Sequence, residues 1–371
     1  MWITLTFFYI FLLFSYFFAW KRLKSWNLPI NCVNNTQIAV VVSARNESAN
    51  IEICLKSILK QNYPKNLFEV WLIDDHSDDD TLEISRKIAA SNLRILSLKD
   101  LGGTGKKRAI TMAIERTKAQ LVVTTDADCV VSANWLKTLA GFYEQNEVKF
   151  FTGPVVFEPC QSVLQKIWAL DFIGMMGITG ASVFKGWSNM SNGANLAYER
   201  AAFLAVDGFK GIDQIASGDD LLLMEKIARH FPNQVAFVKS REAIVKTLPP
   251  ENMRHFLQQR IRWTSKSQFY QDWKITTILG LVWLFNVSII VSFTLFLLGY
   301  PQLGMWICGQ LFCKFLVDWI FLKSCMDFFK EKSKLLWLFL PTQFFQIPYI
   351  VWVGLVGNLG RKYEWKGRKV H

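Results

Sequence analysis

The sequence predicts an α/β domain with a parallel sheet, preceded and followed by membrane-spanning helices. Hydrophobic residues make up 51% of the 371-residue chain and aromatic residues 15%, a composition that indicates apolar segments beyond an ordinary soluble core. Between those segments, residues 29–274 are mixed in composition, and short apolar runs alternate with amphipathic stretches. Alternating strands and helices are typical of a parallel α/β sheet.

The first apolar segment is predicted to be an uncleaved membrane anchor within residues 1–28. Residues 2–20 carry no charge and are long enough to cross a hydrocarbon core of about 30 Å. Lys21, Arg22 and Lys24 follow at once, whereas a cleaved signal peptide carries its positive charge ahead of its apolar part. Because positive flanks stay in the cytosol, we expect the amino end to lie outside.

The carboxyl-terminal region, residues 275–371, is predicted to return to the membrane. Two further spanning candidates lie at residues 275–299 and 305–322. A last apolar stretch, residues 335–359, has basic residues on both sides and contains Pro341 and Pro348. One crossing would move one basic flank out of the cytosol, so we expect a re-entrant or interfacial element rather than a clean span, followed by a basic cytosolic tail.

Two opposite charges lie inside the third spanning candidate. Lys314 and Asp318 are four residues apart, and charges within a membrane are expensive unless they are paired or face a cavity. The spacing favours a structural ion pair, with a substrate pathway as the alternative.

The first half of the α/β domain is predicted to alternate strands with helices. The strands are expected at residues 38–42, 68–73, 93–98 and 121–124, and the helices at residues 50–60, 80–90 and 106–118. Such sheets bind ligands at the carboxyl ends of their strands. Two later amphipathic segments, residues 161–179 and 253–273, are predicted to lie on the membrane surface as interfacial helices.

Asp126 and Asp128 directly follow the apolar run of residues 121–125. Two carboxylates on a turn at the carboxyl edge of a sheet suit one hard cation, Mg²⁺ or Mn²⁺, which would bridge them to a diphosphate. A plain hydrogen-bonded turn is the alternative, because aspartates are common after strands.

Polar residues also follow the second predicted strand and a glycine-rich segment. Asp75 could accept hydrogen bonds from a base N–H or a ribose hydroxyl, with a solvated turn as the alternative. The segment from Asp74 to Asp80 holds five acids, which is costly without a cation or a helix amino terminus nearby. Residues 102–105 precede Lys106 and resemble a phosphate cradle without Walker A spacing; a flexible loop that caps a helix is the alternative.

Two motifs near the end of the domain carry acids and a basic aromatic face. Asp219 and Asp220 precede an apolar helix, and the roles of helix cap and general base can be split between them. Gln259, Arg262 and Trp263 share one helical face. Arginine there would bind a diphosphate and tryptophan a sugar ring, or the helix would simply lie on anionic lipid.

Taken together, these motifs resemble those of the membrane-bound family 2 glycosyltransferases, which include cellulose synthase, hyaluronan synthase and ceramide glucosyltransferase. The motifs, in the order of that family, are residues 43–47, 74–75, 126–128, 218–220 and 259–263. The ordered set is far more specific than any one motif. Residues 364–368 are similar to the tail of lipid-glycosylating members. The resemblance implies a GT-A (Rossmann-like) fold, a nucleotide-sugar donor, Mg²⁺ or Mn²⁺, and inversion at the sugar C1.

The same resemblance implies roles for particular positions. The donor-binding residues would be Asn46, Glu47, Asp75, Lys106, Asp126 and Arg262, and the acceptor-binding residues would be Asn195, Gln259 and Trp263. The metal ligands would be Asp126 and Asp128. Asp220 would be the catalytic base, but the family's usual Glu-Asp is here Asp219-Asp220, which leaves open which carboxylate acts.

Charge and cysteine content narrow the class of protein. The net charge of +12 requires an anionic partner such as a membrane surface, a nucleic acid or a phosphorylated substrate. Seven scattered cysteines without a CxxC pair favour a reducing compartment. We expect an integral membrane glycosyltransferase with its catalytic domain on the cytosolic face, at the inner membrane in a bacterium. It would take a UDP-sugar, a lipid or lipid-linked acceptor and no nucleic acid.

Two alternatives to a lipid glycosyltransferase remain. The first is a processive polysaccharide synthase, for which three confident spans are few. The second is a non-catalytic basic membrane protein that binds lipid or nucleic acid, a class that leaves the acidic strand-end motifs without a purpose.

Overall fold

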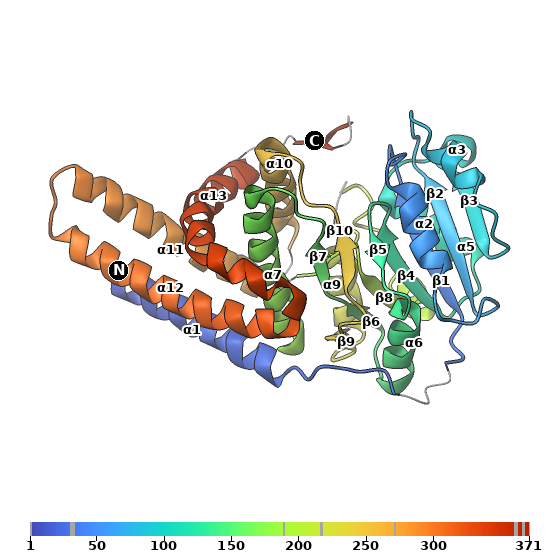
Figure 1. Ribbon diagram of the computed structural model, residues 1–371, viewed down its shortest axis with the longest axis horizontal. Coiled ribbons are helices and arrows are strands. Elements are labelled where there is room, and N and C mark those ends of the chain that lie inside the picture. Colours follow the sequence, from blue (N-terminus) through green and yellow to red (C-terminus); the bar gives the residue numbers. More distant parts are fainter. Residues whose placement is uncertain are drawn as a thin grey trace. The chain divides into compact units, whose positions relative to one another are not determined.

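The structure, a computed structural model, describes residues 2–29, 34–187, 190–215, 218–270, 272–359, 363–365 and 368–370 (Figure 1). The chain divides into two compact units. The sheet unit consists of residues 24–158 and 188–248, and the helical unit of residues 1–23, 159–187 and 249–371. Each unit therefore gathers segments that are far apart in the sequence.

A seven-stranded sheet forms the core of the described part of the sheet unit, in the order β3-β2-β1-β4-β8-β6-β9. Its parallel half consists of β1 (Ile38–Ala44), β2 (Phe68–Asp74), β3 (Leu93–Ser97) and β4 (Leu121–Asp126). The other strands are β6 (Phe150–Thr152), β8 (Leu196–Glu199) and β9 (Val235–Phe237), with β8 antiparallel to β4 and β6. The four predicted strands and their parallel pairing are confirmed.

The parallel half is built from continuous apolar runs because both faces of the sheet are covered. Residues 38–42 of β1 are at most 1% exposed, as expected for a central parallel strand. The helices of this unit are α2 (Ile51–Leu59), α3 (Thr81–Arg86), α4 (Leu98–Leu101), α5 (Lys106–Arg116), α6 (Trp135–Gln145), α8 (Arg200–Ala205) and α9 (Leu221–His230). A second, short sheet joins β5 (Val130–Val131), β10 (Val245–Thr247) and β7 (Val155–Phe157).

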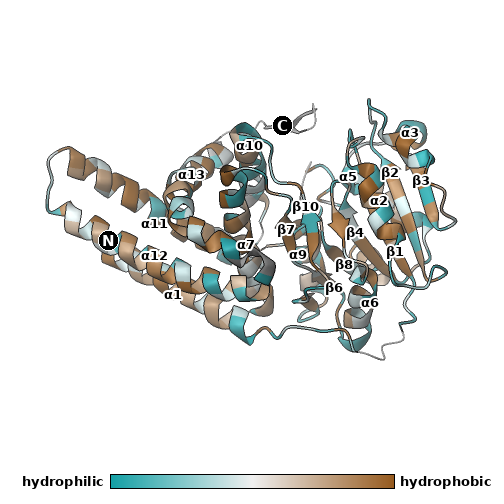
Figure 2. Cartoon of the chain, viewed as in Figure 1, coloured by the Kyte–Doolittle hydropathy of each residue, from teal (hydrophilic) through white to brown (hydrophobic). Residues whose placement is uncertain are grey.

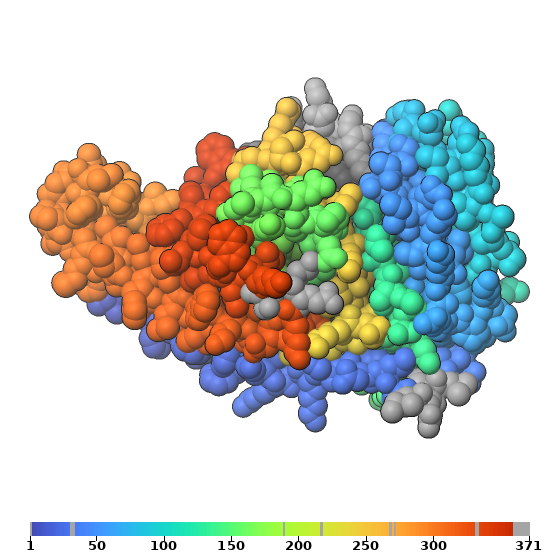
Figure 3. Space-filling model, in the orientation of Figure 1, coloured from blue at the N-terminus to red at the C-terminus, as the bar shows by residue number. Residues whose placement is uncertain are grey.

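Long apolar helices dominate the helical unit. Its elements are α1 (Trp2–Arg22), α7 (Val163–Phe184), α10 (Met253–Thr264), α11 (Trp273–Leu297), α12 (Leu303–Phe328) and α13 (Phe339–Leu359), with 3-10 turns at Ser265–Phe269 and Lys330–Leu338 and a hairpin of β11 (Tyr363–Trp365) and β12 (Arg368–Val370). Among the described residues, five helices are long and apolar enough to cross a membrane (Figure 2). They indicate membrane association. The helices α11 and α12, orange in Figure 3, pack against each other.

The helix α7 differs from the interfacial helix expected at residues 161–179. It runs over Val163–Phe184 and packs against α1, α12 and α13, with most of its residues buried. Small residues allow this packing: a Cβ at Gly177 would meet Cys325 Sγ at 2.2 Å, so the glycine lets α12 approach closely. By length and composition α7 is itself a candidate span.

The helix α13 runs without a break through Phe339–Leu359, where the sequence predicted a re-entrant or interfacial element. Pro341 lies in its first turn, where a proline removes no intrahelical hydrogen bond. Pro348 lies in the interior and is accommodated without ending the helix, as happens in apolar helices packed among neighbours. Whether residues 335–359 form a re-entrant, interfacial or spanning element stays a prediction, because a continuous helix is compatible with each of them.

The predicted ion pair of α12 is confirmed. Lys314 Nζ lies 2.5 Å from Asp318 Oδ2. Tyr9 of α1 donates its hydroxyl to Asp318 Oδ1 at 2.7 Å, and Gln343 of α13 accepts from Lys314 at 2.8 Å. The pair thus ties three helices together, because each charged group has partners on a neighbouring helix as well as its own.

Asp318→Ala is expected to destabilise the protein by about 3–5 kcal/mol, because Lys314 would remain buried without its carboxylate. Asp327→Ala is a matched control on the same helix: Asp327 pairs with Lys21 at 3.8 Å on the surface, where a pair contributes about 0–1 kcal/mol. Unfolding in detergent, followed by circular dichroism, measures both. Equal losses in the two variants would contradict burial as the source of the effect.

Candidate active site

The carboxyl ends of three parallel strands lie level at one edge of the sheet. In the register, Ser43 of β1 faces Asp126 of β4, and Ala44 of β1 faces Asp74 of β2. The polar segments that follow these strands therefore start at the same edge, as predicted. That edge is where open parallel sheets bind ligands.

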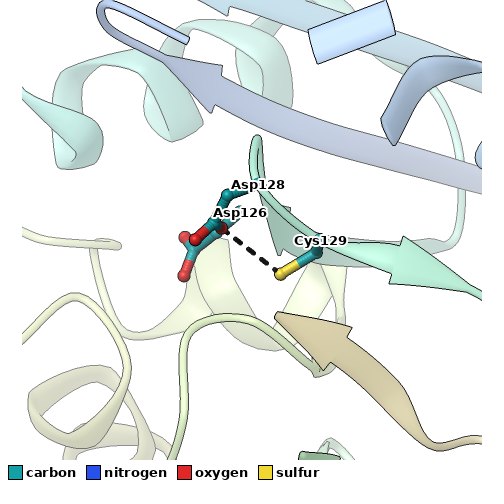
Figure 4. Close-up of side chains that lie close together, drawn as sticks. All are labelled: Asp126, Asp128 and Cys129. Carbon is teal, nitrogen blue, oxygen red and sulfur yellow. Dashed lines mark hydrogen bonds between the residues drawn. The ribbon is translucent and has the colours of Figure 1, made fainter. Parts of the chain in front are cut away.

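Three potential metal ligands lie close together at the end of β4, namely Asp126, Asp128 and Cys129 (Figure 4). One ligand atom of each lies within 4.8 Å of the others. Burial, together with the Asp128 and Asp126 charges, raises the pKa of the Cys129 thiol well above its ordinary value, so the two carboxylates are the useful donors. Asp128 is oriented by Thr247, whose hydroxyl donates to Oδ2 at 3.0 Å. This hard oxygen donor set fits Mg²⁺ or Mn²⁺.

Lys106 joins two acidic segments that are distant in the sequence. It begins α5 directly after Gly105, which has a φ of 90°. Its Nζ lies 2.6 Å from Asp126 Oδ1 and 3.1 Å from Asp219 Oδ2. Burial alone would lower the pKa of Lys106, but the Asp126 and Asp219 charges outweigh it and raise the pKa, so the lysine stays charged.

Asp220 caps α9 and contacts the loop before β8. Its Oδ1 accepts from Leu221 N at 2.7 Å, and its Oδ2 accepts from Gly193 N at 3.2 Å. A Cβ at Gly193 would lie 2.8 Å from Lys106 Nζ and 3.2 Å from Asp219 Oδ2, so a larger residue there would have to displace the Lys106 ammonium. Asp220 therefore caps the amino terminus of α9, and Asp219 pairs with Lys106. The residue before this motif, Ser217, lies outside the described residues.

The residues expected to bind uridine lie on two loops tied to each other. Asn46 has a φ of 51°, and its Oδ1 accepts from Asp78 N at 2.9 Å. Glu47 N donates to Thr81 Oγ1 at 2.7 Å. Asp75, only 1% exposed, accepts from Thr104 Oγ1 at 3.1 Å. The glycine-rich segment thus closes over Asp75.

The acidic stretch from Asp74 to Asp80 is held largely by hydrogen bonds. Asp79 Oδ2 accepts from Ser48 N at 3.0 Å, and its Oδ1 accepts from Thr81 N at 3.0 Å. Burial raises the pKa of Asp79, but the hydrogen bond donated by the Thr81 hydroxyl, together with those from Ser48 and Thr81 N, outweighs it and holds the pKa at about 2. Asp79 therefore links the loop after β1 to the start of α3, which lessens the cost of so many neighbouring acids.

Asn195 is buried, with each polar atom of its side chain in use. Nδ2 donates to Pro154 O at 2.9 Å and to Ala243 O at 2.7 Å, and Oδ1 accepts from Trp135 Nε1 at 3.1 Å. The side chain is 1% exposed. In this arrangement Asn195 fixes the loop before β8, rather than presenting a polar atom to an acceptor as expected from the sequence.

Gln259, Arg262 and Trp263 lie on α10, in the helical unit. Trp263 contacts the ring of Phe172, with centroids 6.1 Å apart, and Gln259 Oε1 is buried without a hydrogen-bond partner among the described residues. The sequence interpretation missed Arg260, which is 3% exposed and pairs with Asp171 at 2.9 Å. Asp171 was the available signal, because an acid within an apolar helix needs a partner.

Comparison with known families assigns the chain. The family model described as "Glycosyl transferase family 2" matches residues 39–177, and the one described as "Glycosyl transferase family group 2" matches residues 121–356, which is more than half of the chain. The protein belongs to glycosyltransferase family 2 and is an enzyme of that family. The non-catalytic alternative is thereby excluded.

Characterised relatives share parts of the sequence. "Glycosyltransferase AglE" of Haloferax volcanii is 32% identical over 32% of this chain and 40% of its own length. "Beta-monoglucosyldiacylglycerol synthase" of Nostoc sp. is 28% identical over 30% of this chain and 24% of its own. "Poly-beta-1,6-N-acetyl-D-glucosamine synthase" of Staphylococcus aureus is 25% identical over 61% and 53%. The matched region spans about half or less of each relative.

A solved structure shares the fold over nearly the whole chain. The "Mannosyltransferase PcManGT from Pyrobaculum calidifontis", in complex with GDP-Man and Mn²⁺, has a TM-score of 0.58 at 18% identity over 96% of this chain and 97% of its own. Together with the family match, it confirms the GT-A (Rossmann-like) fold with an amino-terminal and several carboxyl-terminal apolar helices.

Asp79→Asn is expected to lower the free energy of unfolding at pH 7 by about 1 kcal/mol. The effect is small because Asp79 is exposed and solvent screens its charge. A folded-state pKa of about 2, below the ordinary value of 3.8, means that the contribution is present above pH 4 and is lost as the pH falls toward 2. Unfolding measured from pH 7 down to pH 3 should show the two proteins converging. A constant difference over that range would contradict the role of the carboxylate charge.

Proposed function

We propose that this enzyme is an inverting, metal-dependent glycosyltransferase that moves a sugar from a UDP-sugar to a hydroxyl of a lipid or lipid-linked acceptor. The observation that carries the proposal is the cluster of Asp126, Lys106 and Asp219 at the carboxyl edge of β4, in a chain with five helices able to cross a membrane. Hydrophobic helices give a lipid acceptor a route to the enzyme. The similarity to a glycolipid synthase also supports this acceptor class.

The donor site would be formed by loops at the sheet edge. Asn46, Glu47 and Asp75 would hold the base and ribose, and the segment bearing Thr104 would move to release Asp75, which it covers now. The glycines at positions 102, 103 and 105 all have positive φ, so this segment has backbone freedom that other residues lack. Lys106 would then contact the diphosphate as a point charge.

Asp126 and Asp128 would hold Mg²⁺ or Mn²⁺ beside the diphosphate. When bound, the ion stabilises the negative charge that develops on the leaving group. Lys106, and Arg262 of α10, would stabilise the same charge from the protein. GDP-Man and Mn²⁺ in the structural neighbour support a donor of this chemical type.

The chemistry would be a single displacement. Asp220 takes the proton of the acceptor hydroxyl, the acceptor oxygen bonds to the sugar C1, and the bond from C1 to the diphosphate oxygen breaks on the opposite face. The product is inverted at C1. Asp219, held by Lys106, would keep its neighbour oriented, and Gln259 and Trp263 would contact the acceptor.

The catalytic domain, residues 29–274, would face the cytosol, where nucleotide sugars are available. In this topology residues 1–28 anchor the chain with the amino end outside, and residues 275–371 return to the membrane and end in the cytosol. The basic residues that flank the apolar segments support this orientation.

Purified protein in detergent, given Mn²⁺, radiolabelled UDP- and GDP-sugars and membrane lipid extract, should transfer label into organic solvent. Asp220→Asn is expected to lower kcat by about 10³-fold, while the helix keeps its cap, because asparagine caps as well as aspartate. Asp219→Asn serves as the matched variant and should retain more activity.

Each outcome has a definite meaning. Loss of turnover in Asp219→Asn alone would assign the base to Asp219. Label found in an aqueous polymer instead of the organic phase would support a polysaccharide synthase, the alternative favoured by the similarity over 61% of this chain.

Asp128→Asn is expected to weaken Mn²⁺-dependent binding of UDP by at least about 100-fold, because a carboxylate ligand is lost directly rather than through an outer contact. Asp100→Asn, which removes an exposed carboxylate of α4, is the control and should bind normally. Calorimetry with and without EDTA measures both variants. Equal UDP affinity with and without Mn²⁺ in the unmodified enzyme would exclude the metal site.

A further inference from the structure

A chain of buried polar groups runs through the helical unit and ends on α10. Lys314 of α12, paired with Asp318, donates to Gln346 Oε1 of α13 at 3.1 Å. Gln346 Nε2 donates to Asp171 Oδ1 of α7 at 2.9 Å. Asp171 Oδ2 then accepts from Arg260 Nη2 of α10 at 2.9 Å. Four helices are therefore connected by side chains that apolar packing alone does not require.

Asp171 is the junction of this chain. Besides Arg260 and Gln346, it accepts from Tyr349, whose hydroxyl lies 2.8 and 2.9 Å from its two oxygens. The side chains of Asp171 and Arg260 are 1% and 4% exposed. A buried charge pair with this many hydrogen bonds has a narrow range of allowed geometries, so the position of Arg260 relative to α7 and α13 is closely defined.

Arg260 also organises the aromatic groups of its own helix. Its guanidinium lies 4.5 Å from the ring centroid of Trp263 and 4.9 Å from that of Phe256. Phe256 in turn packs against Trp168 of α7, with centroids 4.8 Å apart. The same side chain therefore fixes how α10 is rotated about its axis and where the Trp263 ring stands.

We propose that Arg260 is a positioning residue for sugar transfer. By pairing with Asp171, it fixes the α10 face that carries Gln259, Arg262 and Trp263. The inference rests on the proposed function, in which that face serves the diphosphate and the acceptor. A displacement of about 1 Å in such groups lowers a rate by about 10²-fold, whereas a purely structural pair would lower stability alone.

Three conservative variants test the proposal in the full-length enzyme. Arg260→Lys keeps the charge but loses the planar fork that arginine presents to a carboxylate, and Asp171→Asn keeps the shape but loses the charge. Asp318→Asn is the matched control, since it weakens a pair of similar burial that does not contact α10 and reaches Asp171 only indirectly, through Gln346.

We expect the variants near α10 to lose kcat, and the control to lose only thermal stability. Arg260→Lys and Asp171→Asn should lower kcat by about 10²-fold, with a much smaller change in donor KM, because the loops at the sheet edge still hold the base and ribose. Asp318→Asn should lower the unfolding temperature by a similar amount and keep its kcat. If all three variants lose kcat in proportion to stability, or if none does, the proposal is wrong.

Hydrogen exchange of residues 253–264 gives a readout that does not depend on activity. Exchange should become about tenfold faster in Arg260→Lys and Asp171→Asn, but not in Asp318→Asn. Double substitution by Arg260→Met and Asp171→Leu, which leaves no unpaired charge, provides a folded variant if the single ones are unstable. Its exchange should also be faster, and unchanged exchange in these variants would overturn the proposal.

The failure of the proposed function would look different. An unmodified enzyme that transfers no sugar to lipid or polymer would contradict that function, whatever the exchange data show. Hydrogen exchange would then still decide whether Arg260 fixes the position of α10. If the amides of residues 253–264 exchange at the same rate in the Arg260 variants, Arg260 does not hold this helix in place.

Discussion

The ammonium of Lys106 is the interaction on which the site of the sheet unit depends. Asp126, Asp128, Asp219 and Asp220 bring four carboxylates to one end of the sheet, and like charges at such distances disfavour ionisation. Lys106 lies within 3.1 Å of two of them and compensates part of this charge. The lysine therefore lowers the repulsion among the acids that the proposed cation binding and base catalysis would use.

The backbone of the loop before β8 is the second constraint. Asn195 secures that loop to Pro154, Ala243 and Trp135, which brings Gly193 N to the Asp220 carboxylate. The contact orients the carboxylate without a further charge, and the absence of a Cβ at position 193 leaves room for the Lys106 ammonium beside it. Most of this support comes from buried groups that never need to touch a substrate.

Local patterns predicted the parallel half of the fold and the edge of the site. The runs at residues 38–42 and 121–124 are apolar because both faces of those strands are covered, and polar residues follow where strands end. Pairings across long stretches of sequence were not predictable, since nothing near Lys106 indicates Asp219. The family resemblance placed Asn195 on the acceptor side, and nothing in the local sequence indicates that its side chain is buried. The continuity of α13 through Pro348 depends on packing by other helices, which periodicity does not report.

The helical unit shows why a few charges matter more there than many apolar contacts. In a lipid environment the hydrocarbon chains are as apolar as leucine, so hydrophobic packing discriminates weakly between helix arrangements. A buried charge discriminates strongly, because any arrangement that leaves it unpaired is costly. Asp171 is the one acid of α7, so α7 is stable only where Arg260 and Tyr349 can reach that carboxylate. The requirement acts in both directions, because Arg260 of α10 is equally costly to bury without the single acid of this largely apolar helix.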